Sequence, residues 1–337
     1  MKVLVTGASG LLGGTTASVL AARGHDVTTF QRRPSGVAGV RDVQGDMSDS
    51  AALRRACDGI DAVVHLAAKV ALTGPEEEYR AINVEGTRAL LAAAREAGAT
   101  RFVQVSSPSV AHTGSSLVGE GAGVADPEHA RGPYARTKAA AELIALAADT
   151  GREGGFAVVA VRPHIVWGPG DTQLVGRVVE RARVGRMVVI GDGTALIDTT
   201  YMDDAAAAIA AALDHAADDD AHGRAFVISS GQPRTVGELL AKMAVAGGAP
   251  VPTRRIPTRA ASAAGHAVEA IWKGLRLAGH PLGAEEPPLT SFLAEQLGTA
   301  HWFDQRETQR VLRWRPQVDL DEGFRRVAAW YAEHDPR

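Results

Sequence analysis

The sequence predicts an α/β fold, and two observations support this. Short apolar runs alternate with helical segments through the first half of the chain, a pattern typical of βαβ units in a parallel sheet. In addition, a glycine-rich stretch at residues 6–13 stands between the first predicted strand and the first predicted helix. Together they indicate a Rossmann-type, doubly wound parallel sheet, followed by a smaller, discontinuous and mostly helical C-terminal region.

The predicted elements of the first half follow one another with short connections. Runs rich in β-branched residues favour strands, while Gly24 and Gly98 stop the helices that precede them. We expect strands at residues 2–5, 27–30, 40–44, 62–66, 102–105 and 157–161. We expect helices at residues 15–23, 51–58, 76–97 and 134–150.

After Pro163 the alternation becomes irregular, which suggests a second region. An acidic linker at residues 216–223 precedes a run that suits a last strand of the main sheet, at residues 225–228. We therefore expect a nucleotide-binding domain of residues 1–163 with a return segment near 200–230. The second region then consists of residues 164–199 and 231–337.

Composition excludes several classes of function. The hydrophobic content of 45%, the charged content of 22% and the net charge of −3 are ordinary for a globular protein and give no reason to expect nucleic acid as a partner. The histidines form no metal-binding pattern, so no metal site is expected. Cys57 is the single cysteine, no apolar run is long enough to span a membrane, and the first strand begins at Lys2. We therefore expect a cytoplasmic location.

The glycine-rich stretch has the spacing G-x-x-G-x-x-G at Gly7, Gly10 and Gly13. Glycines allow a tight turn and a close approach of the backbone to a pyrophosphate, which the N-terminus of the following helix attracts. A plain glycine-rich turn is the alternative, but the strand before it and the helix after it favour a dinucleotide. The candidate cofactor-binding residues here are Gly7, Ser9, Gly10, Leu11, Leu12 and Gly13.

The end of the second strand indicates which dinucleotide is bound. An acidic residue there would bind the ribose 2′-hydroxyl of NAD, but the sequence is Gln31-Arg32-Arg33. Because a guanidinium suits a 2′-phosphate, we expect Arg32 to bind NADP(H), with NAD less favoured; a solvated loop is the alternative. Asp46 is expected to accept from the adenine amino group, with Met47 against the ring.

Tyr134 and Lys138 form a Y-x-x-x-K pair, which lies on one face of a helix. A neighbouring ammonium is expected to lower the pKa of the phenol, so that Tyr134 exchanges a proton with an alcohol or ketone oxygen. Ser106 and Ser107 follow the fifth strand at the sheet edge where ligands bind, and a hydroxyl there can polarise a carbonyl. The alternatives are a surface Tyr–Lys pair and a serine that caps a turn.

These residues resemble the extended short-chain dehydrogenases/reductases, and within them the 3β-hydroxysteroid dehydrogenase branch. The motifs that carry the resemblance span nearly the whole chain: residues 6–13, 45–47, 65–68, 83–87 and 106–110, the Tyr134/Lys138 pair, and Arg162-Pro163. It implies a catalytic set of Ser107, Tyr134 and Lys138. It also implies that Lys138 holds the ribose, that Leu66, Ala67, Ser106, Tyr134, Pro163 and Ile165 contact the cofactor, and that a homodimer forms through helices 76–97 and 134–150.

Within the branch, residues 162–175 are similar to sterol-4α-carboxylate 3-dehydrogenases and to bacterial 2-alkyl-3-oxoalkanoate reductases of long-chain olefin biosynthesis. Residues 286–297 and 301–303 look most like the latter. The resemblance implies NADPH-dependent reduction of a lipid-like 3-keto acid. The alternatives are a 3β-hydroxysteroid or sterol-4-carboxylate dehydrogenase and a nucleotide-sugar epimerase or dehydratase.

The sterol-4-carboxylates and the 2-alkyl-3-oxoalkanoic acids each carry a carboxylate and a large apolar body. Lys69, Arg177 and Arg181 are candidate partners for the carboxylate. Apolar residues at helical spacing predict an amphipathic helix within residues 260–282, either facing the core or acting as a lid or peripheral membrane contact. The apolar positions are Ala260, Ala264, Ala267, Val268, Ile271, Trp272 and Leu275.

Overall fold

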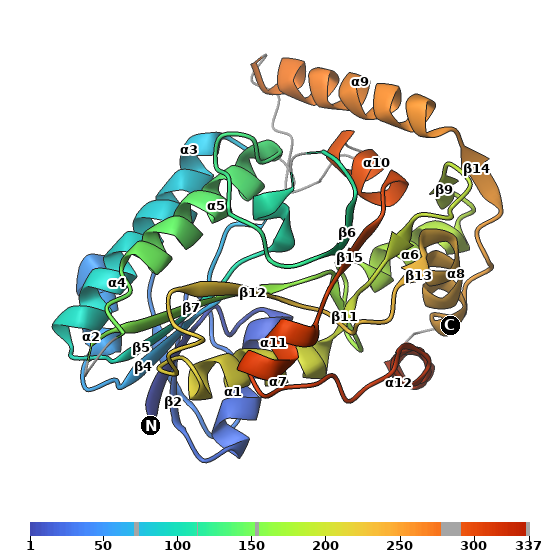
Figure 1. The fold of residues 1–337 in the computed structure, drawn as a ribbon. Coiled ribbons are helices and arrows are strands. Elements are labelled where there is room, and N and C mark those ends of the chain that lie inside the picture. The colour runs from blue at the N-terminus through green and yellow to red at the C-terminus, as the bar shows by residue number, and fades with distance from the viewer. Residues whose placement is uncertain (71–73, 113, 152–154, 278–290, 335–337) are drawn as a thin grey trace.

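The computed structural model describes residues 1–70, 74–112, 114–151, 155–277 and 291–334. Its centre is a parallel sheet of seven strands in the order β12-β7-β5-β4-β1-β2-β3 (Figure 1). The strands are β1 (Lys2–Thr6), β2 (Asp26–Gln31), β3 (Arg41–Gln44), β4 (Ala62–His65), β5 (Arg101–Val105), β7 (Ala157–Pro163) and β12 (Arg224–Ile228). The order reverses beside β1, which confirms the predicted Rossmann-type fold. In such folds ligands bind at the carboxyl ends of the strands on either side of the reversal, here β1 and β4.

Helices cover both faces of this sheet. On one side lie α1 (Leu11–Ala22) and α7 (Met202–Asp214); on the other lie α2 (Ser50–Cys57), α4 (Gly86–Glu96) and α5 (Gly132–Ala147). Side chains of β1 alternate between the two layers: Val3 and Val5 pack with Leu20 and Ile209, whereas Leu4 packs on the opposite side. Apolar residues therefore cover both faces of the central strand.

The single long helix predicted at residues 76–97 is three segments in the structure. A short α3 (Glu76–Tyr79) leads into a π-helical turn, η1 (Arg80–Glu85), and then into α4. π-helical turns are rare and frequently lie at functional sites. The apolar periodicity does not reveal this one, because the extra residue shifts the register by less than a turn.

Outside the central sheet, the chain contains more strand than the sequence indicated, and one of the added strands comes from residues 117–120 of the first half. A four-stranded sheet is formed by β13 (Arg234–Thr235), β10 (Leu196–Ile197), β15 (His301–Phe303) and β6 (Leu117–Glu120), in that order. Two strand pairs join β8 (Val166–Trp167) to β11 (Thr200–Tyr201) and β9 (Val188–Ile190) to β14 (Arg254–Ile256). Of these strands, β9 coincides with an apolar run at residues 187–190 that predicts a strand. The others have only two to four residues, which is too short for a two-residue period to be recognised.

Six helices of the described chain belong to the C-terminal region. They are α6 (Val175–Arg183), α8 (Val236–Ala246), α9 (Thr258–Leu277), α10 (Ser291–Gly298), α11 (Arg306–Val311), which packs against β12 of the central sheet, and α12 (Leu320–His334). The prediction that the region is largely helical is thus confirmed. Within the described residues, no helix is both long and apolar enough to cross a membrane.

α9 lies along the outside of the molecule and packs against α10 (Figure 1). Val268, Trp272 and Leu275 are partly buried. Ala260, Ala264, Ala267 and Ile271 are exposed, so the expectation of a core-facing helix is wrong for that half of the stripe. Residues 278–282 of the predicted helix and residues 286–290 of the motif that resembles the reductases lie outside the described residues.

Candidate active site

The glycine-rich turn joins β1 to α1, and two of its glycines lie too close to neighbouring backbone atoms to accommodate a side chain. Gly7 has φ +79°, and a Cβ atom there would lie 2.8 Å from the Ala67 nitrogen. A Cβ atom on Gly13 would lie 2.3 Å from the Gly7 carbonyl oxygen. Gly10 begins α1 without any side-chain cap, so the first-turn amides have no internal acceptor. Ser9, Gly10 and Leu11 are exposed and Leu12 is half-buried.

Leu66 and Ala67 lie against this turn, at the end of β4. The Leu66 amide donates to the Thr6 carbonyl at 3.3 Å, and the Ala67 amide donates to the Thr6 hydroxyl at 3.1 Å. The structure therefore brings these two predicted residues to the glycine-rich turn, at the point where the strand order reverses.

Of the three residues of the motif at the end of β2, one is buried in the protein and two are exposed to solvent. Gln31 is buried, and its amide donates to Asp42 Oδ1 at 3.0 Å and to the Thr29 hydroxyl at 3.1 Å. Arg32 and Arg33 are exposed. Only the arginines of this motif are thus available to a ligand.

Asp46 and Met47 follow β3. Hydrogen bonds from the Ser48 amide and hydroxyl to Asp46 Oδ1, at 3.0 and 2.7 Å, lower the pKa of this carboxyl, and Arg32 lowers it further. Met47 is only 7% exposed and packs in the core beneath the sheet. Its side chain therefore has little surface to offer an adenine ring.

Ser106 and Ser107 have different surroundings at the end of β5. The Ser106 hydroxyl is buried and has no hydrogen-bond partner among the described residues. The Ser107 hydroxyl accepts from the Ser109 amide at 3.3 Å, and so caps the short 3₁₀ helix η2 (Pro108–Ala111). Ser107 also interacts with the Tyr134 phenol. The predicted alternative of a capping serine is therefore confirmed, and the same side chain also reaches the Tyr134 phenol.

Desolvation shifts the pKa of both Tyr134 and Lys138, which lie on the first turns of α5 and are half-buried and buried, respectively. It raises the pKa of Tyr134 to about 12, although the hydrogen bond of Ser107 acts in the opposite direction. The Lys138 ammonium donates to the Val105 carbonyl at 2.6 Å. Burial lowers the pKa of Lys138 to about 8, against the raising effect of the Glu142 carboxylate. Lys138 is not among the groups that shift the pKa of Tyr134, so the expected lowering of that pKa is absent in this structure.

A buried polar network behind these groups was not predicted as part of the site. His65 lies between the hydroxyls of Thr6 at 2.7 Å and Thr87 at 2.9 Å, and burial lowers its pKa to about 3. Asn83, on the π-helical turn, accepts from the Lys69 amide at 2.7 Å and donates to the Thr137 hydroxyl at 3.1 Å. The network thus connects the glycine-rich turn to α5. His65 and Asn83 lie within the family motifs at residues 65–68 and 83–87, so the resemblance could have indicated that they belong to the site.

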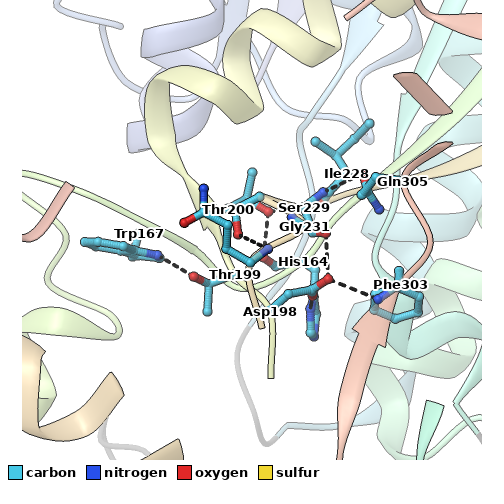
Figure 2. A network of polar contacts seen from close by, with 12 residues as sticks. His164, Trp167, Asp198, Thr199, Thr200, Ile228, Ser229, Gly231, Phe303 and Gln305 are labelled. Carbon is cyan, nitrogen blue, oxygen red and sulfur yellow. Dashed lines mark hydrogen bonds and ion pairs between the residues drawn. The ribbon is translucent and has the colours of Figure 1, made fainter. Parts of the chain in front are cut away.

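Pro163 ends β7, and the backbone beyond it is unusual. Ile165 has φ +44°, which is an outlier for a β-branched residue. The His164 imidazole contacts Asp198 Oδ1 at 2.6 Å, and Asp198 is fully buried. Figure 2 shows this carboxylate among His164, Ser229 and Phe303. The sequence indicated Pro163 and Ile165 but not Asp198, which lies 34 positions from His164.

None of the three basic side chains predicted to bind a substrate carboxylate is singled out by its surroundings. The Lys69 ammonium forms an ion pair with Glu78 at 2.5 Å. The Arg177 guanidinium donates to Gln173 at 3.1 Å. Arg181 is half-buried on α6. The structure favours none of them.

The residues around the point where the strand order reverses, between β1 and β4, fit a bound nicotinamide dinucleotide. The uncapped start of α1 suits a pyrophosphate. The exposed arginines after β2 suit an anionic ribose substituent, and the unpartnered Ser106 hydroxyl suits a polar group at the end of β5. Together these groups extend from the start of α1 to the end of β5, along the carboxyl edge of the sheet.

Comparisons with known proteins agree with this geometry. The family model described as the NAD dependent epimerase/dehydratase family matches residues 3–229. The chain is 42% identical to a 2-alkyl-3-oxoalkanoate reductase of Stenotrophomonas maltophilia, over 98% of this chain and 99% of that protein. It is 29% identical to a 3-beta-hydroxysteroid dehydrogenase of Mycolicibacterium neoaurum, over 98% and 92%.

Among solved structures, MoeE5 in complex with UDP-glucose and NAD superposes with a TM-score of 0.73 at 26% identity, over 99% of both chains. The sequence match, the shared fold and the glycine-rich turn thus agree. The chain belongs to the NAD dependent epimerase/dehydratase family, among the extended short-chain dehydrogenases/reductases, and is an oxidoreductase.

Proposed function

We propose that this enzyme uses NADPH to reduce the 3-keto group of a 2-alkyl-3-oxoalkanoic acid to the 3-hydroxy acid, as a step of long-chain olefin biosynthesis. The observation that carries this proposal is the 42% identity, over 98% of the chain, to a reductase named for that substrate. The contact of Ser107 with Tyr134 at the end of β5, beside buried Lys138, supports a ketone-reducing site there.

The residues have separate roles in this reaction. When bound, NADPH supplies the hydride that reaches the substrate carbonyl carbon. Ser107 donates a hydrogen bond to the carbonyl oxygen and orients it. Tyr134, kept protonated by burial, gives its proton to that oxygen as negative charge develops there. Lys138 supplies a positive charge beside this group and binds the ribose.

The cofactor-binding residues are proposed from their positions. The glycine-rich turn and the start of α1 hold the pyrophosphate, and Leu66, Ala67 and Ser106 line the crevice. Pro163 and Ile165 contact the nicotinamide half, and Asp46 faces the adenine. Arg32 distinguishes NADPH from NADH, because it is exposed at the end of β2 and no acidic side chain takes its place.

We propose that residues 164–199 and 231–337 bind the lipid-like substrate. α9 presents Ile271, 58% exposed, on the outside of this region, which suits a lid or a peripheral contact with a lipid surface; co-sedimentation with anionic vesicles tests the latter. α4 and α5 form the proposed homodimer face, where Leu143 is 38% exposed. A mass of one chain by light scattering would exclude the dimer, and fractionation of cells tests the proposed cytoplasmic location.

A steady-state assay with synthetic 2-alkyl-3-oxoalkanoic acids tests the function. We expect oxidation of NADPH that depends on the keto acid, and a loss of at least about 100-fold in kcat for Tyr134→Phe, the range of general acid catalysis. Arg32→Ala should raise KM for NADPH about tenfold or more by removing a charge-assisted contact, with KM for NADH unchanged. Full turnover by Tyr134→Phe contradicts the proposed proton donor.

A second candidate is oxidation of a 3β-hydroxysteroid or sterol acid, which the 29% identity to a 3-beta-hydroxysteroid dehydrogenase favours. Its test is the same assay run with hydroxysteroids and NAD. A preference for NAD together with steroid turnover would select this candidate over the keto acid reductase. A nucleotide-sugar epimerase would instead retain its cofactor through purification and gel filtration.

A further inference from the structure

Ile165 adopts a backbone conformation that its side chain disfavours. For a β-branched residue a left-handed conformation costs on the order of 1–2 kcal/mol. Such conformations persist only where the surrounding structure determines them. The groups that hold Ile165 are therefore informative about what the conformation is for.

Hydrogen bonds fix the backbone on both sides of this residue. The His164 amide donates to the Ile228 carbonyl at 2.9 Å, and the Thr200 hydroxyl donates to the His164 carbonyl at 2.7 Å. The Thr200 amide donates to the Ile165 carbonyl at 3.2 Å. Immediately beyond, Val166 pairs with Thr200 in the two-stranded sheet.

The side chain of His164 is fixed by a single buried carboxylate. Asp198 Oδ1 lies 2.6 Å from His164 Nδ1, and Asp198 Oδ2 accepts from the Ser229 hydroxyl at 2.7 Å and the Phe303 amide at 3.0 Å. Both Asp198 and Ser229 are fully buried. Figure 2 shows Asp198 with His164, Ser229 and Phe303. The latter three follow β7, follow β12 and end β15, respectively, while Asp198 lies between β10 and β11. Asp198 thus ties the strained segment to three other parts of the chain.

We propose that Asp198 is a positioning residue, which acts through His164 to hold Ile165 in the left-handed conformation required by the nicotinamide half of the cofactor. The inference rests on the proposed function, in which Pro163 and Ile165 line that half. Removing the carboxylate frees the His164 ring, so that only the backbone hydrogen bonds to Ile228 and Thr200 still hold this segment, and Ile165 relaxes in part of the population. The population competent to bind the nicotinamide then falls, and the apparent affinity falls with it.

Cofactor binding tests this without turnover. We expect Asp198→Asn to weaken NADPH binding about tenfold, the effect of a competent population reduced to about one part in ten, measured by the fluorescence of bound NADPH. Affinity for 2′,5′-ADP, which lacks the nicotinamide, should be unchanged. Thr200→Val removes a different contact to the same segment and should show the same selective loss if Asp198→Asn does not fold.

Thr199→Val is the matched control. Thr199 is buried beside Asp198, and its hydroxyl accepts from the Trp167 indole at 2.8 Å, so the variant removes a neighbouring buried contact that involves neither His164 nor Ile165. It should lower Tm while leaving NADPH affinity unchanged. The inference is overturned if Asp198→Asn and Thr200→Val bind NADPH as the wild type does, or if both ligands weaken equally. A wild type that binds neither NADPH nor NADH overturns the proposed function as well.

Discussion

At Tyr134 and Lys138, desolvation acts on two groups of opposite charge, and in each case it favours the neutral form. The phenol therefore holds its proton, with a pKa of about 12, while the ammonium loses its proton more easily, with a pKa of about 8. The sequence placed these side chains on one helix face, but it could not show how far each is buried, which depends on how α5 packs against β7 and η2. In the structure Lys138 donates to the Val105 carbonyl.

The pH dependence of reduction follows from the pKa of Lys138. Below about pH 8 the ammonium is charged, and above it the charge is lost. We expect kcat/KM for the keto acid, which reports the free enzyme, to be level below pH 8 and to fall above it. Glu142→Gln removes the carboxylate that raises the pKa of Lys138, so kcat/KM of this variant should begin to fall at a lower pH than that of the wild type. A profile that stays level to pH 10 in the wild type would exclude a role for the Lys138 charge.

At the level of helices and strands, features set by neighbours in sequence could be predicted, whereas contacts between distant segments could not. The strand, glycine-rich turn and helix at residues 2–22 depend on neighbours in sequence, and the structure has them as β1 and α1. Gln31 turns away from the crevice because Asp42, on the next strand, accepts its amide. The His164–Asp198 pair likewise depends on how β7 and the turn after β10 meet. No period or motif in a single sequence reports such contacts.

The junction of β1 and α1 yields a prediction at this scale. A methyl group at Gly13 would lie 2.3 Å from the Gly7 carbonyl oxygen, a backbone atom that cannot move freely. We expect Gly13→Ala to destabilise the fold by about 1–3 kcal/mol, as overpacking does, despite alanine's better helix propensity, and to weaken NADPH binding. Gly274→Ala in α9 is the control, because no atom lies within 4 Å of its added methyl. Urea unfolding with equal midpoints for the two variants would contradict the packing argument.

Across the whole molecule, a buried ion pair links the sheet to the helix that carries the site. The Arg162 guanidinium on β7 pairs with Glu142 on α5 through its Nε at 2.9 Å and through Nη2, and each side chain is 1% exposed. Arg162 also donates to the carbonyls of Ala122 and Gly123. It thereby fixes the segment that precedes α5. The resemblance included Arg162, but the pairing with Glu142 appears only when β7 and α5 pack together.

Removing one partner of this pair should be costly for the fold. Glu142→Gln leaves the Arg162 charge buried without a counter-charge, and breaking a buried pair in this way costs about 3–5 kcal/mol. Glu307→Gln is the matched control. It breaks the Arg224–Glu307 pair at 2.7 Å, whose side chains are 39% and 60% exposed, and exposed pairs contribute about 0–1 kcal/mol. Urea unfolding followed by circular dichroism compares the two variants. A loss below 1 kcal/mol for Glu142→Gln would mean that water or a shifted side chain compensates Arg162, and that this ion pair does not hold β7, α5 and the preceding segment together.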